Sequence, residues 1–354
     1  MAVGIKWIAT AVVWMTTVRR VLSVTPLHGI YERIETETIE MVYQLPPDTL
    51  ELKGVLAVFH GCSHRATDWF PASDSCKACI GLPVERTIAQ GALDRGFAVL
   101  AISSQNKEHN CWLPHGDIVP VSKAIRHFYE FLKKASKVGS KRRALFSSID
   151  KGVSSTQMMN PPLFLLGASS GGSFVASFAA ESRNLSLHVS AICVQISAIR
   201  QTNHVHVPPT LFVHMASDGH TSRAVGRSIE QLNKKSVGGV AVAAQHVCQS
   251  KVISPSYFHD HGQALSAADS ATLVAALTAA GMIDAATGKL KDDPRMTEWR
   301  QVVSKALPHV VPSKDSLKPD ESAVSELLNM AWAAHEITDE YLPETFKWFL
   351  DHSG

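Results

Sequence analysis

The 354-residue chain has no marked excess of either charge, no internal repeat and no N-terminal apolar run long enough to cross a bilayer. Its 34 Lys and Arg nearly balance 32 Asp and Glu, which gives no indication of an acidic polymer as a partner. The apolar residues 7–18 fall short of the roughly 20 needed to span a membrane. A chain of this length with 45% hydrophobic residues instead predicts one large domain with a sizeable core.

Aromatic residues are also absent from the one local concentration of positive charge, between residues 133 and 143. Nucleic-acid sites usually combine basic groups with stacking side chains, so this cluster predicts a solvated helix end and loop and no nucleic-acid partner. The cluster consists of Lys133, Lys134, Lys137, Lys141, Arg142 and Arg143.

A serine framed by glycines follows a short apolar run. Residues 163–172 read LFLLGASSGG, which places Ser169 in a Gly-x-Ser-x-Gly pattern with Gly167 and Gly171, followed by Gly172. Small flanking residues let a sharp strand-to-helix turn close, and the helix after it offers unpaired N–H groups. The pattern predicts that Ser169 is a nucleophile on such a turn, and a simple Gly/Ser turn is the alternative.

A nucleophilic serine needs a base and an acid that orients the base, in the chain order serine, acid, histidine. The apolar run Thr210–Met215 predicts a buried strand, and Asp218 follows its carboxyl end, the edge where catalytic groups of open α/β sheets gather. We therefore expect Asp218 to be the acid. The alternative is that Asp218 caps a helix beginning near Thr221.

Chain order selects the base among 17 histidines. His335 lies after the last strand-like segment and just before an amphipathic helix predicted over Asp339–His352. His352 is close to the terminus, and three other candidates fall in a predicted insertion: His259, His261 and His309. We expect His335 to be the base.

A second loop is predicted to contribute to an oxyanion hole. The strand-like run Val55–Phe59 leads into His60, Gly61 and Cys62. The backbone N–H of Cys62 and that of Ser170, which follows the nucleophile, would bind a developing negative oxygen. The alternative is an ordinary glycine-containing turn.

With these motifs, the sequence resembles the α/β-hydrolase superfamily, and within it the poly(3-hydroxybutyrate) depolymerase-like and feruloyl-esterase-like proteins. The resemblance spans roughly residues 40 to 352 and is greatest to a eukaryotic branch best known from plants. It implies a serine hydrolase with Ser169, Asp218 and His335 as a triad, and no particular substrate. The motifs that carry it are His60-Gly61-Cys62, the CxxCxGLPxE stretch from Cys76 to Glu85, Cys111-Trp112, GASSGG at 167–172, His335-Glu336 and Trp348-Phe349.

Strand-like and helix-like segments alternate along the chain, which predicts a mostly parallel central sheet with helices on both faces. The predicted strands are 34–44, 54–59, 97–103, 163–166, 187–196, 210–215 and 239–247, and the predicted helices are 84–95, 121–135, 173–180, 221–235 and 339–352. The fold class is therefore α/β, with an α/β-hydrolase catalytic domain over residues 34–352.

The alternation breaks over residues 253–320, which contain five prolines and a helical piece at 266–280. This segment separates the predicted acid from the predicted base. We expect a small cap-like insertion over the catalytic edge, and an insertion packed at the periphery is an equal alternative.

Four of the six cysteines, Cys62, Cys76, Cys79 and Cys111, fall in two upstream loops. They could form two disulfides in any of three pairings, a zinc site or a redox motif. Residues 1–25 fit a secretory signal or a marginal anchor, since Lys6 precedes the apolar run and Arg19 and Arg20 follow it. An organellar presequence is the alternative, because no acidic residue precedes Glu32. A secretory or extracellular location favours disulfides over zinc.

Together these patterns predict a carboxylic ester hydrolase that needs no metal or organic cofactor and acts on a small-molecule or polymeric ester. Two alternatives remain: a serine peptidase of the same fold, and a catalytically inactive binding protein with this fold. Contact with a membrane is expected only through residues 1–25, and the patterns leave the oligomeric state open.

Overall fold

The computed structural model describes residues 25–34, 38–138, 160–199, 207–234, 242–261, 264–310, 317–318 and 321–353. The predicted targeting segment 1–25 therefore lies outside the described residues, except for Thr25. So does the basic cluster beyond the end of the helix that carries Lys133 and Lys134.

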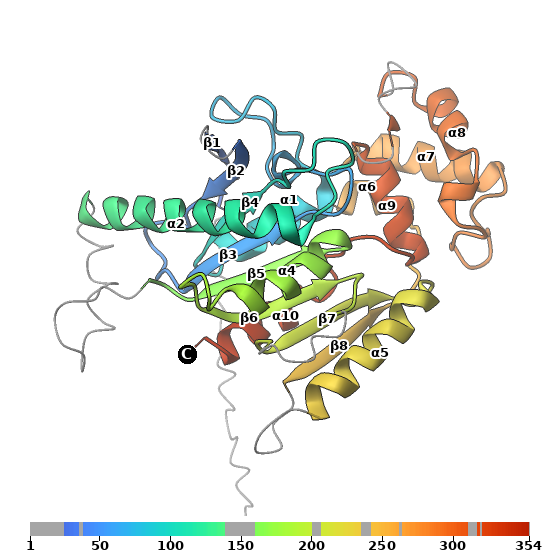
Figure 1. The fold of residues 1–354 in the computed structure, drawn as a ribbon. Helices are drawn as coiled ribbons and strands as arrows, with labels where there is room; N and C mark the ends of the chain where they lie inside the picture. The colour runs from blue at the N-terminus through green and yellow to red at the C-terminus, as the bar shows by residue number, and fades with distance from the viewer. Residues whose placement is uncertain are drawn as a thin grey trace, which may run out of the picture.

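Eight strands form one sheet in the order β1-β2-β4-β3-β5-β6-β7-β8 (Figure 1). β2 pairs antiparallel with both β1 and β4, and all other neighbours are parallel. This arrangement is that of the α/β-hydrolase fold, so the predicted fold class is confirmed. The strands are β1 (Ile30–Ile34), β2 (Ile39–Gln44), β3 (Gly54–Phe59), β4 (Phe97–Ile102), β5 (Leu163–Ala168), β6 (Val189–Gln195), β7 (Thr210–Met215) and β8 (Ala243–Cys248).

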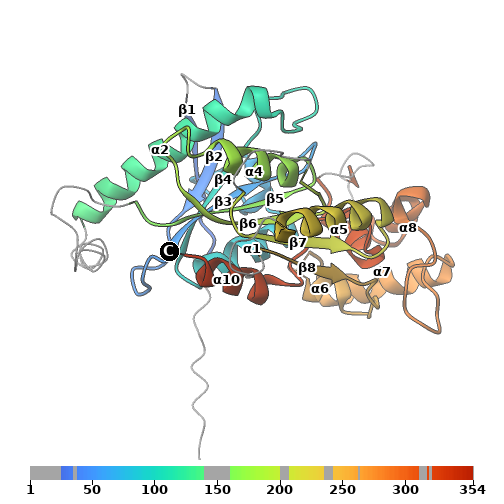
Figure 2. The ribbon, with the colours of Figure 1, turned by 60° about the horizontal axis from the view of Figure 1, so that its bottom comes forward.

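Helices cover both faces of this sheet. One face carries α2 (Pro114–Val138), α4 (Ser170–Glu181) and α5 (Gly219–Lys234), and the other carries α1 (Pro83–Leu93) and α10 (Leu342–Asp351) (Figure 2). Because side chains alternate along each strand, the central strands contribute side chains to two separate apolar clusters, one under each helical layer. Every residue of β3, β4, β5, β6 and β7 is buried.

The remaining helices gather at one end of the sheet (Figure 1). They are α6 (Tyr257–Asp260), α7 (Ala267–Ala279), α8 (Trp299–Ala306) and α9 (Ala323–Trp332), with the 3₁₀ helix η3 (Pro294–Met296) between α7 and α8. The predicted insertion 253–320 thus contributes helices, and α9 follows it. A further 3₁₀ helix, η1 (Ala66–Trp69), follows β3.

Several elements differ from the sequence prediction, and helices α6, α8 and α9 were not predicted. The strand predicted over 34–44 is β2, which begins only at Ile39, and it is preceded by a separate antiparallel strand, β1, that overlaps the prediction only at Ile34. None of the β1 residues is buried, so β1 lacks the pattern that identifies a core strand. Helix α2 begins seven residues earlier than predicted: Pro114 occupies its first position, and the Asp117 carboxylate accepts the Leu113 N–H at 2.7 Å. Among the described residues, none of the helices is both long enough and apolar enough to cross a membrane.

The four loop cysteines form two disulfides, Cys62–Cys111 and Cys76–Cys79. The first joins the loop after β3 to the loop after β4, and the second closes the CxxC turn. Cys193 and Cys248 are free thiols buried in the core. The structure therefore selects one of the three pairings that the sequence left open.

The two disulfides are expected to stabilise the fold by different amounts. Cys62–Cys111 closes a loop with a sequence separation of 49, so its loss should lower the free energy of unfolding by about 2 to 4 kcal/mol. Cys76–Cys79 has a separation of 3, so its loss should cost less. Urea unfolding of Cys62→Ser/Cys111→Ser and Cys76→Ser/Cys79→Ser variants tests this order, and non-reducing peptide mapping tests the pairing. Equal losses, or four free thiols, would contradict it.

Candidate active site

Ser169 occupies a turn between β5 and α4 with a strained backbone. Its φ of 53° and ψ of −116° lie in a region that non-glycine residues rarely adopt. The turn is held from both sides, because Ser169 N–H donates to Gln195 at 3.0 Å and Ser173 N–H donates to the Ser169 carbonyl at 3.0 Å.

The two glycines that flank Ser169 are required by close backbone packing. A Cβ atom at Gly167 would lie 2.3 Å from the carbonyl oxygen of Gly171. A Cβ at Gly171 would lie 2.4 Å from the carbonyl oxygens of Phe59 and His60, at the end of β3. The turn thus packs directly against the loop that carries Gly61 and Cys62.

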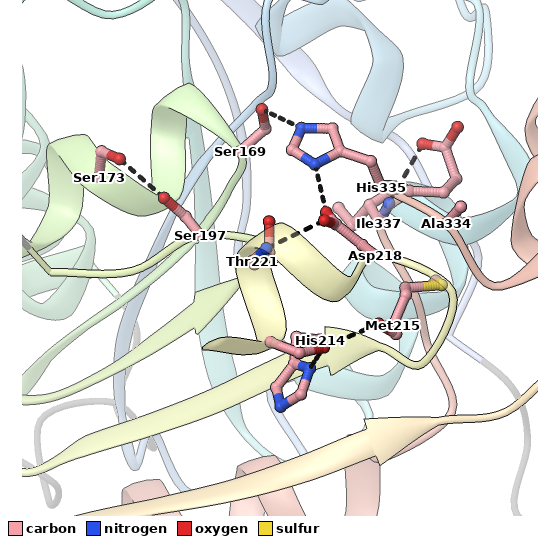
Figure 3. Close-up of polar contacts among 12 residues, drawn as sticks. Ser169, Ser173, Ser197, His214, Met215, Asp218, Thr221, Ala334, His335 and Ile337 are labelled. Atoms are coloured by element: carbon pink, nitrogen blue, oxygen red, sulfur yellow. Dashed lines mark hydrogen bonds and ion pairs between the residues drawn. The ribbon is translucent and has the colours of Figure 1, made fainter. Parts of the chain in front are cut away.

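Three side chains from different parts of the chain form one hydrogen-bonded row (Figure 3). Ser169 Oγ lies 2.9 Å from His335 Nε2, and His335 Nδ1 lies 2.9 Å from Asp218 Oδ2. The structure therefore brings together the serine, histidine and acid singled out in the sequence. The histidine side chain is 47% exposed and the acid 12%, so the acid is the more shielded partner.

The two oxygens of Asp218 have different partners, which agrees with both interpretations of the sequence: contact with His335 and capping of a helix. Oδ2 faces His335, whereas Oδ1 accepts the Thr221 N–H at 3.0 Å in the first turn of α5 (Figure 3). Burial raises the pKa of Asp218, but hydrogen bonds from Thr221 and His335 outweigh it and lower the pKa below its ordinary value. The carboxyl group is therefore ionised at neutral pH.

The loop that carries His335 is fixed through its carbonyl groups. Ala333 and His335 both have positive φ, 57° and 45°. Five successive carbonyls, from residue 331 to residue 335, each accept a hydrogen bond. The donors are Lys251 N–H, Ser217 Oγ–H, Ser217 N–H and, for both Ala334 and His335, the Arg295 guanidinium.

Arg295 comes from η3 in the insertion, and no sequence pattern predicted a role for it. The histidines that competed with His335 have other partners. His352, His259 and His261 contact main-chain carbonyls, and His309 contacts Asp269.

The loop after β3 lies beside the serine. A Cβ at Gly61 would be 3.7 Å from Ser169 Cβ. Among the described residues, neither the Cys62 N–H nor the Ser170 N–H donates to a protein acceptor, so both remain available to an oxyanion. The Cys62–Cys111 disulfide holds this loop from outside.

His60 is a neutral support for the same loop. Its Nε2 accepts the Ser104 N–H at 3.2 Å, so the ring proton is on Nδ1, which donates to the Gly61 carbonyl at 2.6 Å. Burial lowers the pKa of His60 to about 4. Trp112 Nε1–H donates to the His60 carbonyl at 2.9 Å, which gives the Cys111-Trp112 motif a structural role that the sequence alone did not show.

A pocket of about 770 Å³ opens beside Ser169 and His335. Arg295, Trp299 and Arg300 of the insertion line it. The other lining residues come from the β3 and β6 loops, the end of β5, α1, α9 and the His335 loop: Gly61, Cys62, Ser63, His64, Glu85, Ala168, Ile196, Ser325, Glu326, Asn329, Glu336 and Ile337. Most of the lining residues have charged or hydrogen-bonding side chains.

Buried ionisable groups line one side of this pocket. Glu85 and Glu326 form a hydrogen-bonded pair, and burial raises the pKa of both, that of Glu85 to about 7. Burial lowers the pKa of His64, but its hydrogen bond to Asp68 and the charge of Glu85 outweigh this and raise it to about 9. His64 is therefore cationic at neutral pH, and the glutamate pair holds a shared proton.

Among the described residues, no group of three or more His, Cys, Asp or Glu side chains could hold a metal ion.

Comparisons with known proteins add only distant structural similarity. No family model and no curated protein matches the sequence. Among solved structures, XC6422 from Xanthomonas campestris, titled an α/β serine hydrolase without lid, is 13% identical, covers 64% of this chain and 84% of its own, and has a TM-score of 0.37. Est1E from Butyrivibrio proteoclasticus is 10% identical over 62% and 88%, with a TM-score of 0.34. Thermogutta terrifontis esterase 2, phosphoramylated by tabun, is 13% identical over 64% and 83%, with a TM-score of 0.39. Such low similarities transfer no residue roles to this chain, and the narrower resemblance to depolymerases and feruloyl esterases stays a prediction.

The buried glutamate pair predicts a pH-dependent stability. An acid whose pKa is higher in the folded protein than in the unfolded chain stabilises the fold at low pH, and this contribution is lost as the pH rises. For Glu85 the loss should fall between about pH 4.5 and about pH 7 and amount to on the order of 1 to 3 kcal/mol. Glu326→Gln should flatten the decline in urea unfolding measured between pH 4.5 and 8, because it removes the repulsion between the two carboxylates.

Glu344→Gln, at an exposed position of α10, is the matched control and should follow the parent protein across the same range. Parallel pH profiles for all three proteins would contradict the assignment of a shared proton to Glu85 and Glu326.

Proposed function

We propose that this protein is a serine hydrolase that cleaves carboxylic esters through an acyl-enzyme intermediate. The observation that carries the proposal is the continuous row of hydrogen bonds from Ser169 through His335 to Asp218. It supplies a nucleophile, a base within reach of the nucleophile's proton and an ionised acid that orients the base.

In the proposed first step, His335 Nε2 takes the Ser169 hydroxyl proton while Ser169 Oγ attacks the ester carbonyl. Asp218 fixes the imidazole with its proton on Nδ1 and stabilises the imidazolium that forms. The Cys62 and Ser170 N–H groups donate hydrogen bonds to the negative oxygen of the tetrahedral intermediate. His335 then returns the proton to the departing alcohol, and water, activated by the same histidine, releases the acid from Ser169.

We further propose that the insertion is a cap for this site and not a peripheral addition. Three of its residues, Arg295, Trp299 and Arg300, line the pocket, and Arg295 also contacts the His335 loop. The substrate is then a small ester, or one end of a polymeric ester, that fits between the cap and the edge of the sheet. The two disulfides support maturation in an oxidising compartment, as the predicted secretory location requires.

Labelling with a fluorophosphonate probe tests the nucleophile. Ser169→Ala should abolish labelling and lower ester turnover by on the order of 10³ or more, because a triad acts as a unit. Ser170→Ala should keep much of the activity, since the proposal uses only its backbone N–H. Labelling that persists in Ser169→Ala, or is lost only in Ser170→Ala, would mean that Ser169 is not the nucleophile.

A panel of aryl esters and matched peptide anilides then separates an esterase from a peptidase. A folded protein that neither reacts with the probe nor turns over either panel would favour a binding protein that has kept the fold.

Arg295 predicts a kinetic effect that differs from that of its neighbour Arg300. Arg295→Gln should lower kcat and the rate of fluorophosphonate labelling together, by about 10- to 100-fold, because a His335 loop that shifts misplaces the base. Arg300 lines the same pocket but donates to the Leu317 carbonyl instead, so Arg300→Gln should change KM more than kcat. Equal effects of the two variants on kcat would contradict a positioning role for Arg295.

A further inference from the structure

Two carboxyl groups from distant parts of the sequence meet in the wall of the pocket beside Ser169. Glu85 is in the first turn of α1 and Glu326 in the first turn of α9. Their residues are only 2% and 3% exposed, yet both line the pocket. Buried acidic side chains are rare unless a partner compensates for the loss of water.

The fold does not supply that compensation in full. Glu326 Oε2 accepts the Val84 N–H at 3.3 Å, and the two side chains bond to each other. Apart from the bond between the two carboxyl groups, Glu85 Oε2 and Glu326 Oε1 have no hydrogen-bond partner among the described residues. Two buried carboxyl oxygens thus receive no donor from the rest of the described fold, a costly arrangement in a protein interior.

The positive groups around the pocket have other partners. His64 Nδ1 lies 3.0 Å from Asp68 Oδ2, so the charge of His64 is matched by Asp68 and offsets that of Glu85 only in part. Arg295 donates to the His335 loop and pairs with Asp293 at 3.6 Å. Arg300 Nε–H donates to the Leu317 carbonyl, and its guanidinium lies over the Trp299 ring.

The third acid in the pocket, Glu336, adds to the negative charge. It accepts from Asn329 at 3.0 Å and from the Ile337 N–H at 3.1 Å, so both of its oxygens are occupied. The groups that need a ligand are therefore the two glutamates of the pair, and the ligand has to bring hydrogen-bond donors and positive charge.

We propose that the Glu85–Glu326 pair binds an ammonium group of the substrate, so that the pocket selects esters whose acyl or alcohol part carries a primary amine. This proposal rests on the proposed function. An ammonium group offers three N–H donors and one positive charge in a compact volume, which suits two neighbouring carboxyl oxygens better than a hydroxyl group does. A substrate of this kind would be held at its charged end while its ester carbonyl meets Ser169.

Matched aryl esters test the charge preference directly. 6-Aminohexanoyl and heptanoyl esters differ only in an ammonium group in place of a methyl group, and β-alanyl and butanoyl esters form a shorter pair. An adipoyl monoester presents a carboxylate at similar reach. The parent protein should prefer the ammonium ester of at least one pair in kcat/KM by about tenfold or more.

The double variant Glu85→Gln/Glu326→Gln should remove this preference, so that kcat/KM for the ammonium ester falls to the level of its neutral partner. Glu344→Gln, which removes one exposed carboxylate from α10, should leave the preference intact. Fluorophosphonate labelling of Ser169 in each variant checks that the site remains assembled.

The outcomes separate the two proposals. Labelling and ester turnover without a preference for the ammonium ester, or with a preference for the neutral or carboxylate ester, would overturn the ammonium site and leave the proposed hydrolase standing. An equal loss for all esters in the double variant would mean that the pair only supports the fold. No labelling and no turnover in the parent protein would remove the proposed function itself.

Discussion

The close approach of two backbones at the end of β3 is the constraint on which the rest of the site depends. Gly171 in the first turn of α4 leaves no room for a side chain against the carbonyls of Phe59 and His60. This contact sets the distance between the serine turn and the loop that presents the Cys62 N–H. The strained φ and ψ of Ser169 persist because the strands and the helix around that contact are themselves buried and fixed.

The histidine side of the site is built on a different principle. The serine lies on a turn between regular elements, but His335 lies on a loop whose positive φ angles would not persist without support. Donors from the loop after β7, from the segment after β8 and from the insertion contact that loop. Gln195 adds a reciprocal pair of hydrogen bonds with the Thr338 main chain, at 3.0 and 2.9 Å. The orientation of the imidazole is thus a property of the tertiary structure.

The sequence predicted best the parts that local patterns specify. Buried parallel strands are continuous apolar runs, so β3, β4, β5 and β7 were located within two residues or less. Gly167 and Gly171 identified the serine turn because close packing there excludes other side chains. Chain order then led to Asp218 and His335, which the structure places in contact.

Features that depend on long-range contacts could not be predicted from local sequence patterns. Glu85 and Glu326 are 241 positions apart and come from helices that meet only in the folded protein, and nothing local to either residue signals the pairing. Nothing in the sequence distinguishes Arg295 from the other basic residues, because its contact with the His335 loop forms only in the folded protein. The disulfide pairing was equally undetermined, because loop geometry decides which cysteines meet.

Asp218 illustrates how closely structure and chemistry are joined in this fold. One carboxylate orients the imidazole and also caps the first turn of α5. Removal of this carboxylate would take a hydrogen-bond acceptor from the first turn of α5 and release the imidazole of the proposed base at the same time. An aspartate at this position is therefore favoured by the start of α5 as well as by the proposed reaction, and its presence alone does not identify an active hydrolase.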